Sequence, residues 1–117
     1  MTRSSRALGR AMGYCLVHPA HDDPVAALSD VMGGGGVQVD RVDRKAARIT
    51  GRIGAADGTP ACRVTVSLYS RLGLSFVEIV CEATEKAASG EGLVRQVARL
   101  KGRLQESLPT ESTDRGD

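Results

Sequence analysis

Histidine and acidic side chains gather in one short segment near the start of the chain. His18 and His21 stand three residues apart and are followed by Asp22 and Asp23. Such groups can bind zinc, but a zinc site needs further ligands at a suitable spacing, and the sequence offers none. Asp23 precedes Pro24, which is typical of a helix N-cap followed by the first helical residue. The segment therefore predicts a solvent-exposed loop and helix cap, and no metal site.

Three cysteines and a run of four glycines could also support chemistry. Cys15 stands near His18, as a nucleophile stands near its base, but the apolar run at residues 13–17 favours a buried thiol. The number of cysteines is odd and no C-x-x-C pair occurs, so we expect reduced, buried thiols at Cys15, Cys62 and Cys81. The glycines at 33–36 lack the Lys-Ser/Thr of a phosphate-binding loop and predict a helix stop. We expect a module that is not itself an enzyme and that uses no cofactor.

Basic side chains are concentrated in the middle and late parts of the chain. Residues 41–103 carry twelve Lys and Arg against six Asp and Glu, whereas the net charge of the whole chain is +2. One basic group alternates along predicted strands on the solvent side, and a second follows the predicted last helix in four-residue steps. We predict that these residues bind anionic lipid headgroups or an acidic partner: Arg48, Arg52, Arg63, Arg95, Arg99, Lys101 and Arg103. The alternative is a solvated surface on which arginine stems cover the helix.

The elements that position these residues are indicated by the spacing of apolar side chains. Alternating or continuous apolar patterns predict strands at residues 13–17, 37–41, 47–53, 62–69 and 74–81. Helical spacing predicts a short helix at residues 25–32, ended by Gly33, and a longer one at 93–108. These elements predict an α+β fold in the order strand, helix, four-stranded antiparallel meander, helix, with both helices packed on one face of the sheet.

The expected turns also predict which side chains face each other. If Asp57-Gly58 forms the turn of one hairpin, Arg52 lies opposite Arg63, an unfavourable pair that a bound anion would relieve. Arg48 is expected to pair with Asp40 across the preceding hairpin, which would neutralise it. The open question is therefore how much positive charge the sheet leaves exposed.

Length and composition are those of one folded domain. The chain has 117 residues, of which 41% are hydrophobic and 26% are charged. We expect a flexible leader at residues 1–12, the α+β domain at 13–108 and a disordered tail at 109–117. No apolar run approaches the ~18 residues of a membrane span. From the predicted reduced thiols we expect a cytoplasmic protein, and binding to acidic lipids would make it a peripheral membrane protein.

The order of elements resembles the kinase-associated C-terminal domain of AMP-activated, microtubule-affinity-regulating and plant calcineurin-B-like-interacting protein kinases. Similar features are Gly36-Val37-Gln38-Val39 at the second strand, Val77-Glu78-Ile79 in the last strand and Ser89-Gly90-Glu91 before the last helix. The chain departs from the family in carrying aliphatic, not aromatic, residues on its last helix, and the spacing before that helix is longer. The resemblance implies a regulatory or targeting module of a serine/threonine protein kinase, which binds acidic phospholipid membranes or holds the kinase domain inactive.

Two other classes of function stay open. A meander followed by a helix also resembles the end of a polo box, so the alternative is a docking domain that binds a kinase domain or a partner subunit. Nucleic-acid binding is not favoured, because the predicted exposed sheet face offers only Tyr69 for base stacking. The sequence does not define the oligomeric state.

Overall fold

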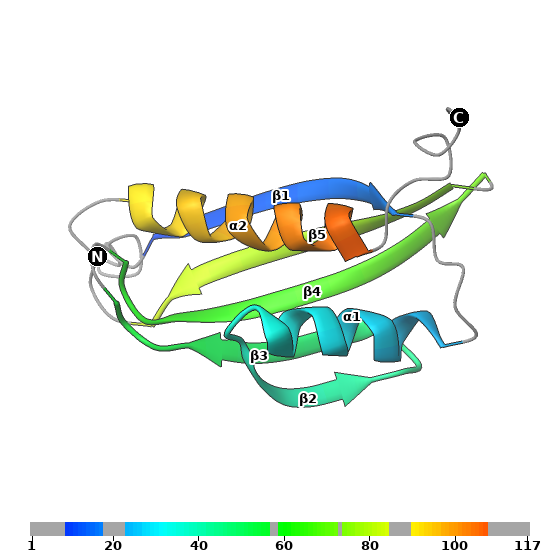
Figure 1. Cartoon of the computed structure of the whole chain (residues 1–117), viewed down its shortest axis with the longest axis horizontal. Coiled ribbons are helices and arrows are strands. Elements are labelled where there is room, and N and C mark those ends of the chain that lie inside the picture. The colour runs from blue at the N-terminus through cyan, green and yellow to red at the C-terminus, as the bar shows by residue number, and fades with distance from the viewer. Residues whose placement is uncertain (1–8, 18–22, 57–58, 73, 85–89, 108–117) are drawn as a thin grey trace, which may run out of the picture.

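A computed structural model describes residues 9–17, 23–56, 59–72, 74–84 and 90–107. Its elements follow the predicted order (Figure 1). They are β1 (Arg10–Val17), α1 (Pro24–Gly34), β2 (Gln38–Asp43), β3 (Arg48–Ile53), β4 (Cys62–Arg71), β5 (Leu74–Ala83) and α2 (Glu91–Ser107). The predicted tail, residues 1–8 of the predicted leader, the segment with His18 and His21, and the Asp57-Gly58 turn lie outside the described residues.

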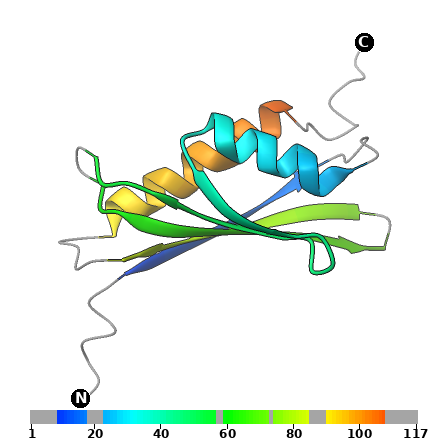
Figure 2. The same ribbon diagram turned by 90° about the horizontal axis from the view of Figure 1, so that it is seen from below.

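The five strands form one antiparallel sheet in the order β1-β5-β4-β3-β2. Strands β2 to β5 are the predicted meander, in which chain neighbours pair. Strand β1 lies at the far side of the meander and pairs with β5, with Arg10 opposite Glu82. An edge view shows both helices on the same face of the sheet, so the predicted two-layer α+β arrangement is confirmed (Figure 2). The opposite face, which neither helix covers, is called the open face below.

Strand β1 is longer than the sequence predicts. It begins at Arg10, within the segment expected to be a leader. Cys15 and Val17 are buried beneath the helices, and the side chains that alternate with them lie on the open face. A larger residue would not fit at Gly13, because a Cβ there would lie 2.8 Å from Val97 Cγ1 of α2. This close approach brings α2 down onto the edge of the sheet.

Helix α1 begins as predicted, with Asp23 as its N-cap. The Asp23 carboxylate accepts a hydrogen bond from Ala26 N–H at 3.1 Å, and Pro24 occupies the first turn. Arg44 also binds this carboxylate, and its guanidinium together with the Ala26 N–H holds the pKa of Asp23 below its usual value. The helix continues past the stop predicted at Gly33 and ends one residue later.

The core lies between the helix layer and the sheet. Its most deeply buried helical side chains are Leu28 and Met32 from α1 and Leu93, Leu100 and Leu104 from α2, all at most 1% exposed. The central strands contribute side chains that are equally buried: Ile49, Val64, Val66, Val77, Ile79 and Cys81. The hydrophobic core of the described residues is thus aliphatic and sulfur-containing, and the aromatic rings lie elsewhere.

Candidate binding surface on the open face

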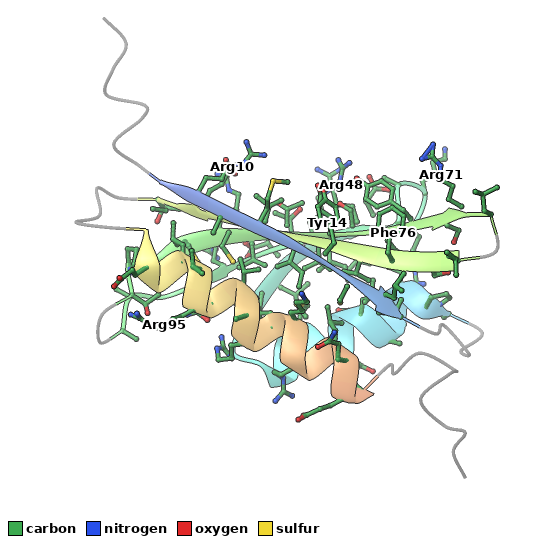
Figure 3. The ribbon with its side chains drawn as sticks, turned by 90° about the horizontal axis from the view of Figure 1, so that it is seen from above. Arg10, Tyr14, Arg48, Arg71, Phe76 and Arg95 are labelled. Atoms are coloured by element: carbon green, nitrogen blue, oxygen red, sulfur yellow. The ribbon has the colours of Figure 1, made fainter. Side chains whose placement is uncertain are left out.

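The open face carries every aromatic side chain of the protein. The sequence has two Tyr, one Phe and no Trp, and the rings come from Tyr14 (β1), Tyr69 (β4) and Phe76 (β5). Aromatic rings normally supply much of a protein core. Here Tyr14 is 51% exposed, Tyr69 is 41% exposed and Phe76 is partly buried. Figure 3 shows Tyr14 and Phe76 on the side of the sheet away from the helices. The prediction that this face offers only Tyr69 was therefore wrong.

The three rings lie around one carboxylate. Tyr69 and Phe76 are directly opposite each other across β4 and β5, and their rings stack with centroids 5.2 Å apart. The Tyr14 and Phe76 centroids are 6.1 Å apart. Tyr14 Oη donates to Glu78 at 2.9 Å and Tyr69 Oη donates to it at 3.3 Å. The first of these bonds and the negative charge of Glu78 raise the pKa of Tyr14. We call these four residues the aromatic cluster.

The β4–β5 turn carries the most exposed large apolar side chain of the described residues. Leu72 is 94% exposed, and its φ of 55° lies in the left-handed region, which is disfavoured for leucine by about 1 kcal/mol. Leu74 is 58% exposed, and Arg71 precedes the turn. A shallow hollow of about 510 Å³ is lined by the aromatic cluster together with Ser70 and Arg71. We call Arg71, Leu72 and Leu74 the hairpin tip.

Three of the predicted anion-binding residues lie on the open face. Arg52 and Arg63 are directly opposite each other, so the predicted register of β3 and β4 is confirmed. Arg48 extends from the same face of β3 (Figure 3). On the described part of this face, arginines outnumber carboxylates by six to four. The arginines are Arg10, Arg41, Arg48, Arg52, Arg63 and Arg71, and the carboxylates are those of Asp40, Asp43, Glu78 and Glu82. The face is therefore charged and moderately basic.

The predicted pair between Arg48 and Asp40 was wrong, because a different arginine binds this carboxylate. Arg52 donates two hydrogen bonds to Asp40, at 2.9 and 3.0 Å. Arg48 lies directly opposite Asp43, because residues 44–47 form the β2–β3 turn, and a bulge in β2 at Asp40 brings that carboxylate to Arg52. Arg48 Nε donates instead to Ser67 Oγ at 3.3 Å, and no ion pair to Arg48 occurs among the described residues. Asp40 thus neutralises Arg52, and Arg48 is the more available cation of the two.

Two of the predicted residues on α2 join the helices to each other. Arg99 Nη1 donates to the Gly35 carbonyl oxygen at 2.6 Å, at the C-terminal end of α1. Its other guanidinium nitrogens donate to Gln96 Oε1 at 2.6 and 2.9 Å. Arg103 packs on the same end of α1, since a Cβ at Gly35 would lie 2.8 Å from Arg103 Cδ. Arg99 and Arg103 therefore connect α2 to α1 within the helix layer.

The remaining two predicted residues also lie on α2. Arg95 Nη1 is 3.9 Å from Glu91 Oε1, one turn earlier in the helix. Lys101 lines a hollow between α2 and β1. The seven predicted residues therefore lie in two different layers, three on the open face and four on α2, and do not form one surface.

Sequence reasoning missed the apolar part of the open face. The β2–β3 turn, which contains Lys45, lies at the same end of the sheet as the hairpin tip (Figure 1). One signal was visible in the sequence, because Leu72 occupies a predicted turn, where polar residues and glycine are usual. The orientation of Phe76 was not visible, since a continuous apolar run does not show which side chains face the core.

The candidate nucleophiles and metal ligands lie in the core or outside the described residues. Cys15, Cys62 and Cys81 are buried and free, as predicted. A hydrogen bond with Cys62 and burial raise the pKa of Cys81, so this group is a thiol at neutral pH. The described residues contain no group of three His, Cys, Asp or Glu placed to hold a metal ion.

Comparisons with known proteins address only the fold. No family model and no curated protein matches the sequence. Among solved structures, the chain is similar to DynU16, a protein of the dynemicin biosynthetic locus, with a TM-score of 0.51 and 18% identity over 86% of this chain. The match covers 48% of DynU16, so the chain spans about half the length of that protein. At this identity the likeness shows the fold alone. No helix of the described residues is long and apolar enough to cross a membrane.

Proposed function

We propose that this chain is a non-catalytic targeting module of a serine/threonine protein kinase, and that its open face binds membranes containing acidic phospholipids. The kinase context is supported by the resemblance to kinase-associated domains, and the membrane role by the chemistry of the open face. Inhibition of the kinase domain is the second role that the resemblance implies, and the same uncovered face is available for it.

The observation that carries the proposal is the exposure of the hairpin tip. Leu72 is 94% exposed in a backbone conformation that disfavours leucine, which indicates a use for an apolar side chain at this position. Most of the exposed large apolar side chains lie at the tip or on the open face: Met12, Tyr14, Leu16, Tyr69, Leu72 and Leu74. Burial of one leucine contributes about 1.5–3 kcal/mol, and the acyl region of a bilayer offers that burial.

Cations near the tip match the headgroups of acidic lipids. Arg71 is part of the tip, and Arg48 and Lys45 lie toward the same end of the sheet. Each Lys or Arg near a charged leaflet contributes about 1 kcal/mol. Tyrosine favours the boundary between hydrocarbon and headgroups, where Tyr14 and Tyr69 would lie when Leu72 is inserted. The apolar tip thus has cations and tyrosines close to it, as a membrane-binding surface requires.

The same rings could stack on nucleic-acid bases, but the charge at their centre opposes this use. Glu78 lies between the two tyrosine hydroxyls, where a bound strand would bring its phosphates close to a carboxylate. A lipid surface places its phosphates at the margin of the face, beside Arg48 and Arg71. The arrangement therefore favours a membrane over a nucleic acid.

Vesicle sedimentation tests the proposal. The chain should pellet with phosphatidylcholine vesicles that contain phosphatidylserine, should pellet less as salt is raised, and should stay in solution with phosphatidylcholine alone. Leu72→Ser should weaken binding about tenfold, because one buried leucine is lost. Val42→Ser is the matched control, because Val42 is an exposed apolar residue on the edge strand β2 that lies opposite Ile49, on the helix side of the sheet and not on the open face. It should bind as the unchanged chain does.

Two results would overturn the membrane role. One is equal binding of Leu72→Ser and the unchanged chain, and the other is equal binding to neutral and acidic vesicles. With either result, docking of a protein on the open face becomes the better interpretation, and capture of an oligonucleotide in a gel-shift assay would instead favour nucleic acid.

A further inference from the structure

The two edges of the sheet differ in how they are protected against pairing with another strand. Natural proteins protect sheet edges with bulges, charges and prolines. Edge strand β2 has a bulge and carries Asp40, Arg41 and Asp43. Edge strand β1 is eight residues long, has regular pairing and no proline, and carries only Arg10 as a charge. The β1 edge is therefore open to another strand.

Alternate backbone groups of β1 point toward that edge. The Ala83 N–H donates to the Gly9 carbonyl oxygen at 3.2 Å, which places the hydrogen bonds to β5 at the odd-numbered residues of β1. The N–H and C=O groups of Met12, Tyr14 and Leu16 consequently point outward. No described segment pairs with them, because β1 is the last strand of the sheet.

A mostly apolar hollow, with Lys101 as the one charged residue among the described residues that line it, lies beside this edge between β1 and α2. Its volume is about 200 Å³, and Ala11, Gly13, Val94 and Ala98 are among the residues that line it. Val94 is 59% exposed and Met12, on the other side of the strand, is 46% exposed. A second strand along β1 would be flanked by apolar side chains on both faces of the sheet.

We propose that β1 pairs with β1 of a second copy of this chain, antiparallel about a two-fold axis at Met12. Only the even-numbered residues carry outward backbone groups, so the pairs are Met12 with Met12 and Arg10 with Tyr14 of the other copy. The Arg10 guanidinium then lies over the Tyr14 ring, whose hydroxyl is bonded to Glu78. A register centred one residue later would place Arg10 opposite Leu16, which offers no such partner.

The helix side of the strand fits the same register. Ala11 lies opposite Gly13 of the other copy, and these are the smallest side chains of β1. Little side-chain volume separates the two α2 helices there, so Val94 and Ala98 of both copies can approach each other. The same strand supplies the cation and its aromatic partner, which is why a second copy fits this edge better than an unrelated peptide. The product is a ten-stranded sheet with both open faces on the same side, and it does not depend on the membrane role.

Sedimentation velocity with a matched pair of variants tests the proposal. Proline at position 12 removes an N–H that the β1–β5 ladder does not use, whereas alanine keeps that N–H. The unchanged chain should sediment as a concentration-dependent dimer. Met12→Pro should raise the dimer dissociation constant by at least ~100-fold, since two symmetry-related hydrogen bonds and their neighbours are lost. Met12→Ala should raise it less, and thermal melting shows whether each variant is folded.

A cross-link tests the register. The three native cysteines are buried, so Met12→Cys adds the one exposed thiol of the described residues. Directly opposed residues of this kind have Cα atoms about 5.5 Å apart, within reach of a disulfide. Mild oxidation should join Met12→Cys into a covalent dimer, and Thr65→Cys, in the middle of the open face, should stay uncoupled. A chain that sediments as a monomer throughout its soluble range, or a dimer that Met12→Pro leaves intact, would overturn the proposal.

Discussion

At the scale of single residues, Glu78 determines the electrostatics of the aromatic cluster. Each of its two carboxylate oxygens accepts a hydrogen bond from one tyrosine hydroxyl. These bonds fix the positions of the two tyrosine rings around a negative charge on an exposed surface. Exposed tyrosines usually sample several rotamers, and ordering them costs side-chain entropy. The cluster is therefore ordered before any partner arrives, which lowers the entropic cost of binding.

Removal of this charge should change the titration of Tyr14. The raised pKa of Tyr14 means that its contact with Glu78 stabilises the fold below the ordinary value of 10.0 and that this contribution is lost as pH rises through the folded-state pKa. Glu78→Gln keeps an acceptor and removes the charge, so the pKa of Tyr14 should fall toward 10.0. The chain has two tyrosines and no tryptophan, so phenolate absorbance reports the change directly. Glu82→Gln, on the same face of β5, is the control, and an unchanged Tyr14 titration in Glu78→Gln would contradict the assignment.

At the scale of elements, α2 is connected to α1 by arginines that the sequence alone suggested as ligand-binding residues. Gly34 and Gly35, at the C-terminal end of α1, leave room for Arg103, and the carbonyl oxygen of Gly35 accepts a hydrogen bond from Arg99. These contacts satisfy a carbonyl group at a helix end, which would otherwise need water or another partner. The positive charge of the helix layer thus has a structural use that its spacing does not reveal.

Arg99 and Arg48 should respond in opposite ways to substitution. Arg99→Ala removes a charged hydrogen-bond donor from the α1–α2 contact and should lower the free energy of unfolding by about 1–2 kcal/mol, while vesicle binding by the folded protein changes little. Arg48→Ala should leave stability nearly unchanged and should weaken vesicle binding a few-fold, by about 1 kcal/mol. Urea unfolding and vesicle sedimentation measure the two effects. Loss of lipid binding in Arg99→Ala without loss of stability would place the lipid site on α2 instead.

The spacing of apolar residues predicted the elements well, because period and burial are linked in a two-layer fold. The Asp23 cap and the pairing of Arg52 with Arg63 also followed from local signals. The long-range geometry of the sheet did not follow from local signals. The partner of β1 depends on where the chain returns after α1, and the position of the β2–β3 turn together with the bulge at Asp40 gives this carboxylate to Arg52 and places Arg48 opposite Asp43. The hairpin tip was missed because Leu72 was predicted only as part of a turn and Leu74 only as the start of a strand.

At the scale of the whole molecule, the two faces of the sheet carry different kinds of side chain. The helices bury one face of the sheet and fill it with aliphatic side chains, while the rings, the hairpin tip and the best-placed cations stay on the open face. A core without aromatic residues leaves all three rings for the surface, and such a surface is typical of a recognition site. The open face is consequently the part of the molecule on which the proposed function rests.

Insertion of the hairpin tip into a bilayer can be measured with one introduced fluorophore. The sequence has no tryptophan, so Leu72→Trp places a single indole at the tip, and Val42→Trp places one on the β2 edge as a control. With phosphatidylserine vesicles, the emission of Leu72→Trp should shift to shorter wavelength and should be quenched by brominated acyl chains, while Val42→Trp should show neither change. A Leu72→Trp protein that pellets with these vesicles but keeps the emission of a solvent-exposed indole would contradict the proposed insertion.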